Sequence, residues 1–353
     1  MDSENSKIEA IIIDIISKPE NFMFFLGAGF SNEIGLPTAS DLGKILEKEF
    51  KERGIITEEL QENEKDLDKL IGLLLNKGVK RKDICEVIEK ELQIKKDVLK
   101  VRSEKNFLGL FYRIINEGIF RKSREPIQIN IATTNWDEAL SKVFGEEPLS
   151  IFSGNEVRER LNIPSRKIVI YHLHGSIKDC DSMVLTEEEK SEIKERDAVL
   201  WNSFKAEVDK HRILFIGYGL ADEDILNIYI KSRKNVGELK DYIIVNDDES
   251  KERIERKLKE NKLENIATVI IINSLKFLEE LARSMGLSLV TEKVELETEK
   301  RINEKLGKKR VIVTGYPASG LTTLYLNYLD KLPEKKLHLD GYKYEEDKKK
   351  VIR

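Results

Sequence analysis

The sequence predicts an α/β protein: a doubly wound parallel sheet of the Rossmann-like kind with an inserted helical layer, followed by the start of a second, P-loop-like α/β unit. Two observations support this fold class. Short apolar runs of strand length alternate with helix-length charged segments, which is typical of parallel strands buried on both faces. The first run also breaks into a glycine turn and a helix, the strand–loop–helix unit of such sheets.

The elements follow in this order. A helix near residues 8–17 precedes the strand FMFFL and its glycine turn. From residue 41 to about 122, apolar residues recur at three- and four-residue spacing, which predicts the inserted helical layer. Helical patterns at 275–285 and 291–306 close the unit. Between the layer and these helices, further strands are predicted in the runs IQINIATT, IVIYHLHG, RILFIGYG, DYIIVND and ATVIIIN.

The domain organisation follows from these elements. We expect residues 1–300 to form the sheet unit, residues 301–309 to form a linker, and residues 310–353 to begin another unit with the strand RVIVTG. A complete doubly wound domain needs more chain than this last segment offers. We interpret it as a partial or degenerate P-loop NTPase-like segment, either part of a longer protein or an appendage of the first domain.

Composition and charge exclude several classes of partner. Of the 353 residues, 61 are Lys or Arg and 65 are Asp or Glu, so the net charge of −4 lacks the basic excess of a nucleic-acid binder. No apolar stretch approaches the roughly 18 residues of a membrane span, and the acidic N-terminus differs from a signal peptide. Cys85 and Cys180 lie too far apart in sequence for a C-x-x-C metal knuckle or a secreted disulfide framework. We therefore expect a cytoplasmic protein without membrane contact, and nucleic acid is not indicated as a partner.

The first glycine loop has two interpretations. Gly27, Ala28 and Gly29 follow the first buried strand, and Ser31 stands where the next helix begins. A loop without bulky side chains lets backbone amides and the positive end of a helix approach a pyrophosphate closely. Alternatively, the glycines only permit a tight turn from strand to helix.

Polar residues also follow the next two strands. The motif TTNWD places Asn135 and Asp137 at the carboxyl end of a strand, where open parallel sheets bind ligands, although Asp137 could equally serve as a helix-start acid. In YHLHGS, period-two alternation places His172 and His174 on one face. A zinc site would need a third ligand from distant carboxylates or Cys180, so we favour an accessible His174 as a general base with a pKa near neutrality. A hydrogen-bonded structural role fits His172 better.

Taken together, the segments GAGFSNEIGLPT, TTNWD, HLHGS, GYGLADEDI and IIVND resemble the sirtuin superfamily, specifically its prokaryotic sirtuin-like NAD-hydrolysing family known from antiphage defence. The resemblance covers roughly residues 22–273 and rests on five motifs in a fixed order. It implies that His174 is the catalytic histidine and that Asn135 also belongs to the catalytic residues. It further implies that Asn135 and Asp137 hold the ribose and the nicotinamide amide.

The same resemblance implies the residues that bind the rest of the dinucleotide. The expected pyrophosphate loop consists of Gly27, Ala28, Gly29 and Ser31. The expected contacts to the adenosine half come from Gly217 and Asn246.

The sequence departs from the deacetylating sirtuins at two places. Those proteins carry Asp-Phe-Arg after the Gly-Ile-Pro turn, whereas this chain has Thr38-Ala39-Ser40 after Gly35-Leu36-Pro37. They also carry a four-cysteine zinc module, which two cysteines cannot form. Both departures make removal of acyl groups from lysine the less favoured reaction.

A second glycine loop follows the strand RVIVTG. It contains Gly315, Gly320 and Thr322 and precedes a helical segment, as a phosphate loop does. Leu321 stands where the phosphate-binding lysine belongs, so backbone amides could still hold a diphosphate while the charge that supports hydrolysis is missing. We expect a degenerate site for ATP or ADP, similar to signal-transducing ATPase (STAND-like) sensors.

Together these features predict an NAD+ glycohydrolase (NADase), a triggered antiviral-defence effector that cleaves NAD+ to nicotinamide and ADP-ribose. NAD is then the substrate, no zinc or other metal is expected, and the expected partners are a homo-oligomer and a trigger from a phage or a partner protein. Two alternatives stay open: an NAD-dependent protein deacylase, and a non-catalytic module that senses NAD, ADP-ribose or another nucleotide.

Overall fold

The computed structural model describes residues 2–61, 64–94, 107–121, 123, 127–145, 149–151, 168–236, 239–287, 343–345 and 350–352. The chain divides into two compact units, Met1–Leu289 and Val290–Arg353. In the second unit, β8 (Lys343–Glu345) and β9 (Lys350–Ile352) form an antiparallel pair. The predicted helix at 291–306, the linker at 301–309 and the second glycine loop with Gly315, Gly320 and Thr322 lie outside the described residues.

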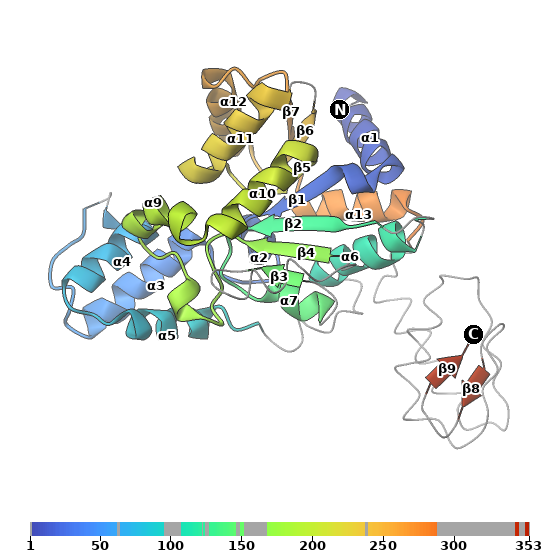
Figure 1. Cartoon of the computed structure of the whole chain (residues 1–353). Helices are drawn as coiled ribbons and strands as arrows, with labels where there is room; N and C mark the ends of the chain where they lie inside the picture. Colours follow the sequence, from blue (N-terminus) through green and yellow to red (C-terminus); the bar gives the residue numbers. More distant parts are fainter. Residues whose placement is uncertain are drawn as a thin grey trace. The chain divides into compact units, whose positions relative to one another are not determined.

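A seven-stranded parallel sheet forms the centre of the first unit, in the order β3-β4-β2-β1-β5-β6-β7 (Figure 1). This confirms the predicted doubly wound fold. The strand order reverses at β1, which pairs with β2 on one side and with β5 on the other. The strands are β1 (Phe22–Leu26), β2 (Ile129–Thr133), β3 (Leu149–Ile151), β4 (Ile168–His172), β5 (Arg212–Ile216), β6 (Asp241–Val245) and β7 (Ala267–Ile271).

Helices cover both faces of the sheet, and each face has its own apolar core. Along β1, Phe24 and Leu26 belong to one core while Met23 and Phe25 belong to the other, so a strand buried on both sides reads as one continuous apolar run. The first face is covered by α1 (Asp2–Ser17), α6 (Phe107–Arg113), the π-helix η3 (Ile114–Phe120), α7 (Ala139–Phe144) and α13 (Ser274–Ser284). The second face is covered by α10 (Ala198–Lys210), α11 (Glu223–Val236) and α12 (Asp248–Glu260).

The inserted helical layer consists of α3 (Ala39–Glu52), α4 (Leu67–Asn76) and α5 (Arg81–Glu91), which enclose a third apolar core. This layer is narrower than the predicted 41–122 segment, because residues 107–120 pack on the sheet instead; the ring centroids of Phe24 and Phe111 lie 5.6 Å apart. Helical periodicity shows that a segment has an apolar face, but it does not show which partner that face meets.

Three short helices and one longer helix lie near the ends of the central strands. η1 (Pro19–Asn21) leads into β1, and α2 (Ala28–Asn32) follows it. η4 (Cys180–Ser182) and α9 (Glu187–Arg196) connect β4 to α10. In the described part of the chain, no helix has the length and apolar character needed to cross a lipid bilayer.

Candidate functional site

Two glycine loops meet at the carboxyl ends of β1 and β5. The amide of Gly27 donates to the carbonyl oxygen of Ile216 at 3.1 Å, and the amide of Gly29 donates to that of Gly217 at 3.0 Å. A Cβ atom on Gly27 would lie 2.5 Å from the Gly217 oxygen, and one on Gly217 would lie 2.3 Å from the amide nitrogen of Phe30. Gly217 also has a φ of +63°. Only glycine fits these positions, because the two backbones are in direct contact.

This contact changes the role expected of the first glycine loop. The amides of Gly27 and Gly29 already have carbonyl acceptors, so they are not free to bind phosphate in this arrangement. Ala28 and Ser31 do line the neighbouring cleft. The amide of Ala28 is the first of α2, where a helix offers no internal acceptor. The glycines therefore join the loops to each other, and Ala28 is the position of this glycine turn that lines the cleft.

A polar network connects the loops after β1 and β2. The side-chain amide of Asn135 donates to the carbonyl oxygen of Gly27 at 3.0 Å and to the Ser31 hydroxyl at 2.9 Å. The Ser31 hydroxyl in turn donates to Asp137 at 2.6 Å. Because both hydrogens of the Asn135 amide are engaged, its carbonyl oxygen is the atom that this side chain can offer to a ligand.

Asp137 combines both roles considered for it. Its side chain lines the cleft, and its carboxylate accepts a hydrogen bond from the amide of Ala139 at 2.9 Å near the beginning of α7. Burial raises the pKa of Asp137, while the hydrogen bond from Ser31 opposes this shift. Asp137 thus fixes the orientation of Ser31, and Ser31 fixes that of Asn135.

The two histidines occupy different environments, contrary to the predicted shared face. β4 ends at His172, and His174 lies in the turn beyond it, so strand alternation does not extend to His174. His172 is buried, and burial lowers its pKa to about 4. His174 lines the cleft. The structural role expected of His172 agrees with this burial.

The predicted accessibility of His174 was wrong, and the pKa of its side chain is lowered. The side chain is only 5% exposed, and Gly175 does not open a path to it: the glycine instead lets the backbone of Ser182 pack against the turn, where a Cβ atom would lie 2.1 Å from the Ser182 oxygen. Burial is the main influence and lowers the pKa of His174, although the charge of Asp222 opposes it. At neutral pH this histidine is therefore uncharged and able to accept a proton.

The cleft has a volume of about 960 Å³ and lies at the strand ends where the strand order reverses, the usual ligand position in such sheets. Gly27 and Gly29 do not line it. Asn246 does not line it: its side-chain oxygen accepts a hydrogen bond from the amide of Ser274 at 3.3 Å, beside the start of α13. The predicted site residues that do line the cleft are Ala28, Ser31, Asn135, Asp137, His174 and Gly217.

Two further walls of the cleft come from the helical layer and from α9. Asp68 of α4 and Lys190 of α9 form an ion pair at 2.8 Å, and Asp222 lies 4.0 Å from the same Lys190 nitrogen. Although burial acts against the charge, the hydrogen bond with Asp68 raises the pKa of Lys190. The hydroxyl of Tyr218 donates to Asp222 at 2.8 Å. All four side chains line the cleft.

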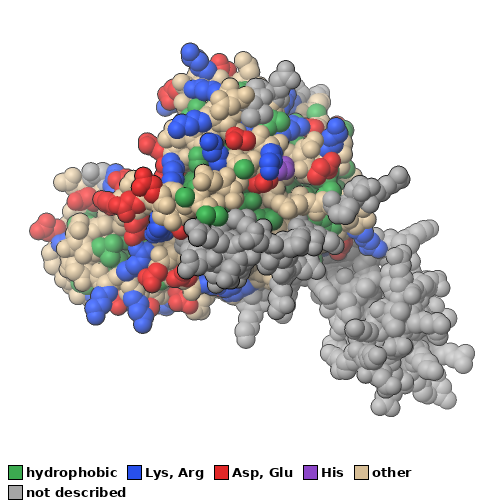
Figure 2. Space-filling view, viewed as in Figure 1, with side chains coloured by type: hydrophobic (Ala, Val, Ile, Leu, Met, Phe, Trp, Pro, Cys, Tyr) green, Lys and Arg blue, Asp and Glu red, His purple; other side chains and the backbone are tan. Residues whose placement is uncertain are grey.

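Sequence reasoning missed these residues or gave them no function. Lys190 lies in a highly charged segment that reads as a solvated helix face, and Asp222 follows a glycine turn where acids are common. Figure 2 shows Asp and Glu side chains gathered over α9, whose first turn holds Glu187, Glu188 and Glu189. Acidic side chains also dominate the charged part of the cleft lining: Asp66, Asp68, Asp137, Glu187, Asp222, Glu223 and Asp224, beside Lys190.

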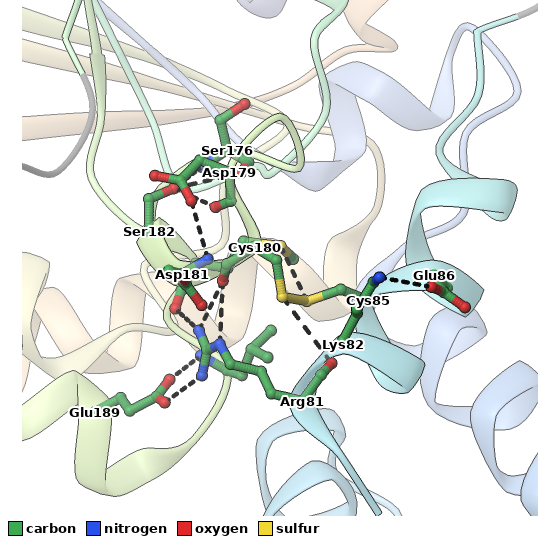
Figure 3. Close-up of a disulfide and its surroundings, with 12 residues drawn as sticks. Arg81, Lys82, Cys85, Glu86, Ser176, Asp179, Cys180, Asp181, Ser182 and Glu189 are labelled. Carbon is green, nitrogen blue, oxygen red and sulfur yellow. Dashed lines mark hydrogen bonds and ion pairs between the residues drawn. A yellow bond between two sulfur atoms is a disulfide. The ribbon is translucent and has the colours of Figure 1, made fainter.

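A disulfide joins the helical layer to the segment after His174 (Figure 3). Cys85 of α5 pairs with Cys180 of η4, and their Cα atoms lie 6.0 Å apart. Arg81 reinforces the connection by donating to the carbonyl oxygens of Cys180 and Met183 and by pairing with Glu189. The sequence did not predict this bond, because the two cysteines are 95 residues apart and meet only when the helical layer packs against the segment after His174.

The bond has two further consequences. A disulfide is uncommon in a reducing cytoplasm, so the expected cytoplasmic location stays a prediction. The paired Cys180 is also no longer the free thiolate considered as a metal ligand for the histidines. Among the residues that the structure describes, no group of three or more His, Cys, Asp or Glu side chains is arranged to hold a metal ion.

The fold and the site together define a Rossmann-like α/β protein with a ligand cleft at the point where the strand order reverses. Residues 129–266 match the family model described as the SIR2-like domain. This match supports a sirtuin-like family and implies binding of NAD. The matched part contains Asn135, Asp137, His174 and Gly217, whereas the first glycine loop precedes it. No curated protein matches the chain.

Proposed function

We propose that this protein is an NAD+ glycohydrolase that releases nicotinamide and ADP-ribose from NAD+. The observation that carries the proposal is the convergence of Asn135 and His174 on one cleft from the ends of the neighbouring strands β2 and β4. Ser31 joins them from the loop after β1. The SIR2-like match supports NAD as the substrate, and a cleft where the strand order reverses is a suitable place for a dinucleotide.

In the proposed reaction, the oxygen of a water molecule attacks C1′ of the nicotinamide ribose. The bond from C1′ to the nicotinamide nitrogen breaks, and its electron pair leaves the nicotinamide neutral. The proton of the attacking water passes to His174, which is uncharged at neutral pH because burial lowers its pKa. The carbonyl oxygen of Asn135 accepts a hydrogen bond from the ribose or the water and so orients it.

Positive charge develops on the ribose as nicotinamide leaves, and the acidic lining of the cleft suits this charge. Asp222 and Asp224 line the same cleft as His174, and their charges act on that histidine, so they are suited to stabilise a cationic transition state there. They would also stabilise the imidazolium formed when His174 takes up the proton. This stabilisation accelerates cleavage to the extent that the positive charge at C1′ is greater in the transition state than in bound NAD+.

We favour hydrolysis over protein deacylation because the chain lacks two features of deacetylating sirtuins, the Asp-Phe-Arg segment and the four-cysteine zinc module. Thr38, at the position after the Gly-Leu-Pro turn, caps α3 through a reciprocal pair of hydrogen bonds with Asp41. The only two cysteines are joined to each other, which leaves no thiolates for a zinc module. The resemblance to antiphage effectors further leads us to propose a defence role, in which a phage or partner-protein trigger activates an oligomer that depletes NAD.

The test is release of nicotinamide from NAD+ by the purified chain, measured chromatographically with and without an acetyl-lysine peptide. We expect release without the peptide. The variant His174→Ala should lose about 10²- to 10⁴-fold in rate, as expected for removal of a general base. Strict dependence on the peptide would support the deacylase instead, and NAD binding without release would support a sensing module.

A further inference from the structure

The ion pair between Asp68 and Lys190 connects the two walls of the cleft. Asp68 comes from the helical layer and Lys190 from α9, and the Lys190 nitrogen lies 2.8 Å from the Asp68 carboxylate. Both side chains line the cleft, yet they are only 19% and 32% exposed. Backbone contacts connect His174 to the helix that carries Lys190. The amide of Val184 donates to the His174 carbonyl oxygen at 3.0 Å, and the amide of Leu185 donates to the carboxylate of Glu189, the neighbour of Lys190, at 2.6 Å.

The walls that carry this pair are tied together. Met183 and Leu185, which follow His174 in the chain, belong to the apolar core of the helical layer, and Trp136, next to Asn135, packs against it. The disulfide between Cys85 and Cys180 and the contacts of Arg81 lie in the same region (Figure 3). The walls are thus held by packing, by hydrogen bonds and by a covalent bond, so a large ligand could not simply push them apart.

We propose that the Asp68–Lys190 pair determines acceptor specificity: it closes the His174 end of the cleft to nucleophiles larger than water. This inference rests on the proposed function and names the second substrate of that reaction. A larger alcohol would react by the same balanced step, in which its oxygen bonds to C1′, nicotinamide leaves with the electron pair, and the hydroxyl proton passes to His174. The pair excludes the alcohol because the ionic contact fixes both side chains in the cleft lining, and it leaves the chemistry unchanged.

The experiment compares methanol with 1-propanol as competitors of water. The purified full chain is incubated with NAD+ and each alcohol at equal molarity, and the alkyl ADP-ribose products are separated by chromatography. For the variants Asp68→Ala and Lys190→Met, the ratio of propyl to methyl product should rise severalfold above that of the unaltered protein. A ratio that stays unchanged in both variants would overturn the proposal.

A matched control removes an ion pair elsewhere in the same layer. Glu47 and Lys51 pair at 2.6 Å within α3, and neither lines the cleft, so Glu47→Ala should leave the product ratio unchanged. Circular dichroism and thermal unfolding of each variant show whether it is folded. Lys190→Met keeps most of the apolar stem of the side chain and so serves if Asp68→Ala does not fold.

A second readout does not depend on turnover and therefore separates this proposal from the proposed function. Diethyl pyrocarbonate modifies accessible histidines, and mass spectrometry with fragmentation distinguishes His174 from His172. If neither the unaltered protein nor any variant releases nicotinamide, the proposed function fails. The modification rate of His174 still shows whether the Asp68–Lys190 pair restricts access to this histidine. Faster modification of His174 in Asp68→Ala than in the unaltered protein, with the rate at His172 unchanged, would show that the pair restricts access to His174. Equal rates at His174 in the two proteins would overturn the proposal.

Discussion

The amide of Gly29 donates a hydrogen bond to the carbonyl oxygen of Gly217 at 3.0 Å, which joins the loops after β1 and β5. These loops meet at the place where the strand order reverses. Ala28 and Ser31, which follow β1, line the cleft there. The contact explains why two glycine motifs nearly two hundred residues apart in sequence occur in one protein. Neither motif has room for a side chain because the other motif lies against it.

Replacing Gly217 with alanine should destabilise the protein more than the same change at another glycine with positive φ. Gly54 has a φ of +72°, and a Cβ atom there would have nothing within 4 Å, so Gly54→Ala carries only the backbone cost of about 1 kcal/mol. Gly217→Ala adds a clash with the backbone of Phe30 and should cost about 3 kcal/mol or more in the free energy of unfolding. Urea unfolding measures both, and equal losses would argue against the tight contact.

Ser31→Ala should impair both stability and catalysis. The change leaves the buried Asp137 carboxylate without its donor at 2.6 Å, which should cost about 1–3 kcal/mol in the free energy of unfolding. It also removes one of the two hydrogen bonds that orient the Asn135 amide, and misplacement of an orienting group can lower kcat by up to about a hundredfold. Steady-state kinetics and chemical unfolding measure the two effects. Ser17→Ala, which removes an exposed hydroxyl that donates to the Asp14 carbonyl oxygen, is the matched control and should change neither.

The rate of NAD cleavage should depend on pH through His174. Burial lowers the pKa of His174 below its ordinary value of 6.5, so the ring is neutral, and competent as a base, throughout the range above that value. The kcat/KM value should therefore stay level from pH 8 down to about 6.5 and decline only at lower pH. A profile that already falls between pH 8 and pH 7 would show that the essential base has a raised pKa and is not this histidine.

The stability of the fold should depend on pH through His172. Its pKa is about 4 in the folded protein and about 6.5 in the unfolded chain, so the unfolded chain binds the additional proton between these values. The contribution is fully present above pH 6.5 and is lost as the pH falls towards 4, with a total of roughly 3 kcal/mol. Urea unfolding at several pH values measures this slope. In His172→Gln the slope over the same range should be shallower, whatever the absolute stability of that variant.

Much of the fold could be predicted because its strands are buried on both faces and its helices are amphipathic. β3 escaped prediction because Leu149–Ile151 is too short to show a pattern. Within the site, Asn135 and His174 could be found because their motifs directly follow strong strands. Lys190 could not, because a lysine in a charged helix looks the same in sequence whether it faces water or Asp68.

The environment of His174 could not be predicted either. Its burial depends on the segment from Gly175 to Leu185, which packs into the core of a helical layer that lies far upstream in the chain. Asn246 also follows a strand, but its side-chain oxygen accepts a hydrogen bond from the amide of Ser274 and it does not line the cleft. Both outcomes depend on contacts between distant segments, which periodicity and motifs do not encode.

Reducing the disulfide should lower stability. Cys85 and Cys180 are 95 residues apart, and a cross-link that closes a loop of this length restricts the unfolded chain by about 4–5 kcal/mol in the chain-entropy description. The variant with Cys85→Ser and Cys180→Ser should unfold at a lower urea concentration than the oxidised protein and at nearly the same concentration as the dithiol-treated protein. Identical unfolding of the oxidised and reduced proteins would show that the bond does not contribute.

The disulfide also determines whether the fragments separate after a protease cuts the chain. β2, β4, Asn135 and His174 all lie between Cys85 and Cys180 in the sequence, so the cross-link closes a covalent ring that contains these strands and both proposed catalytic side chains. A single cut anywhere in that ring produces two fragments that stay bonded to each other, and gel electrophoresis without a reducing agent would still show one species. Nicked protein can therefore keep its catalytic side chains in one covalent molecule until a reductant releases the fragments.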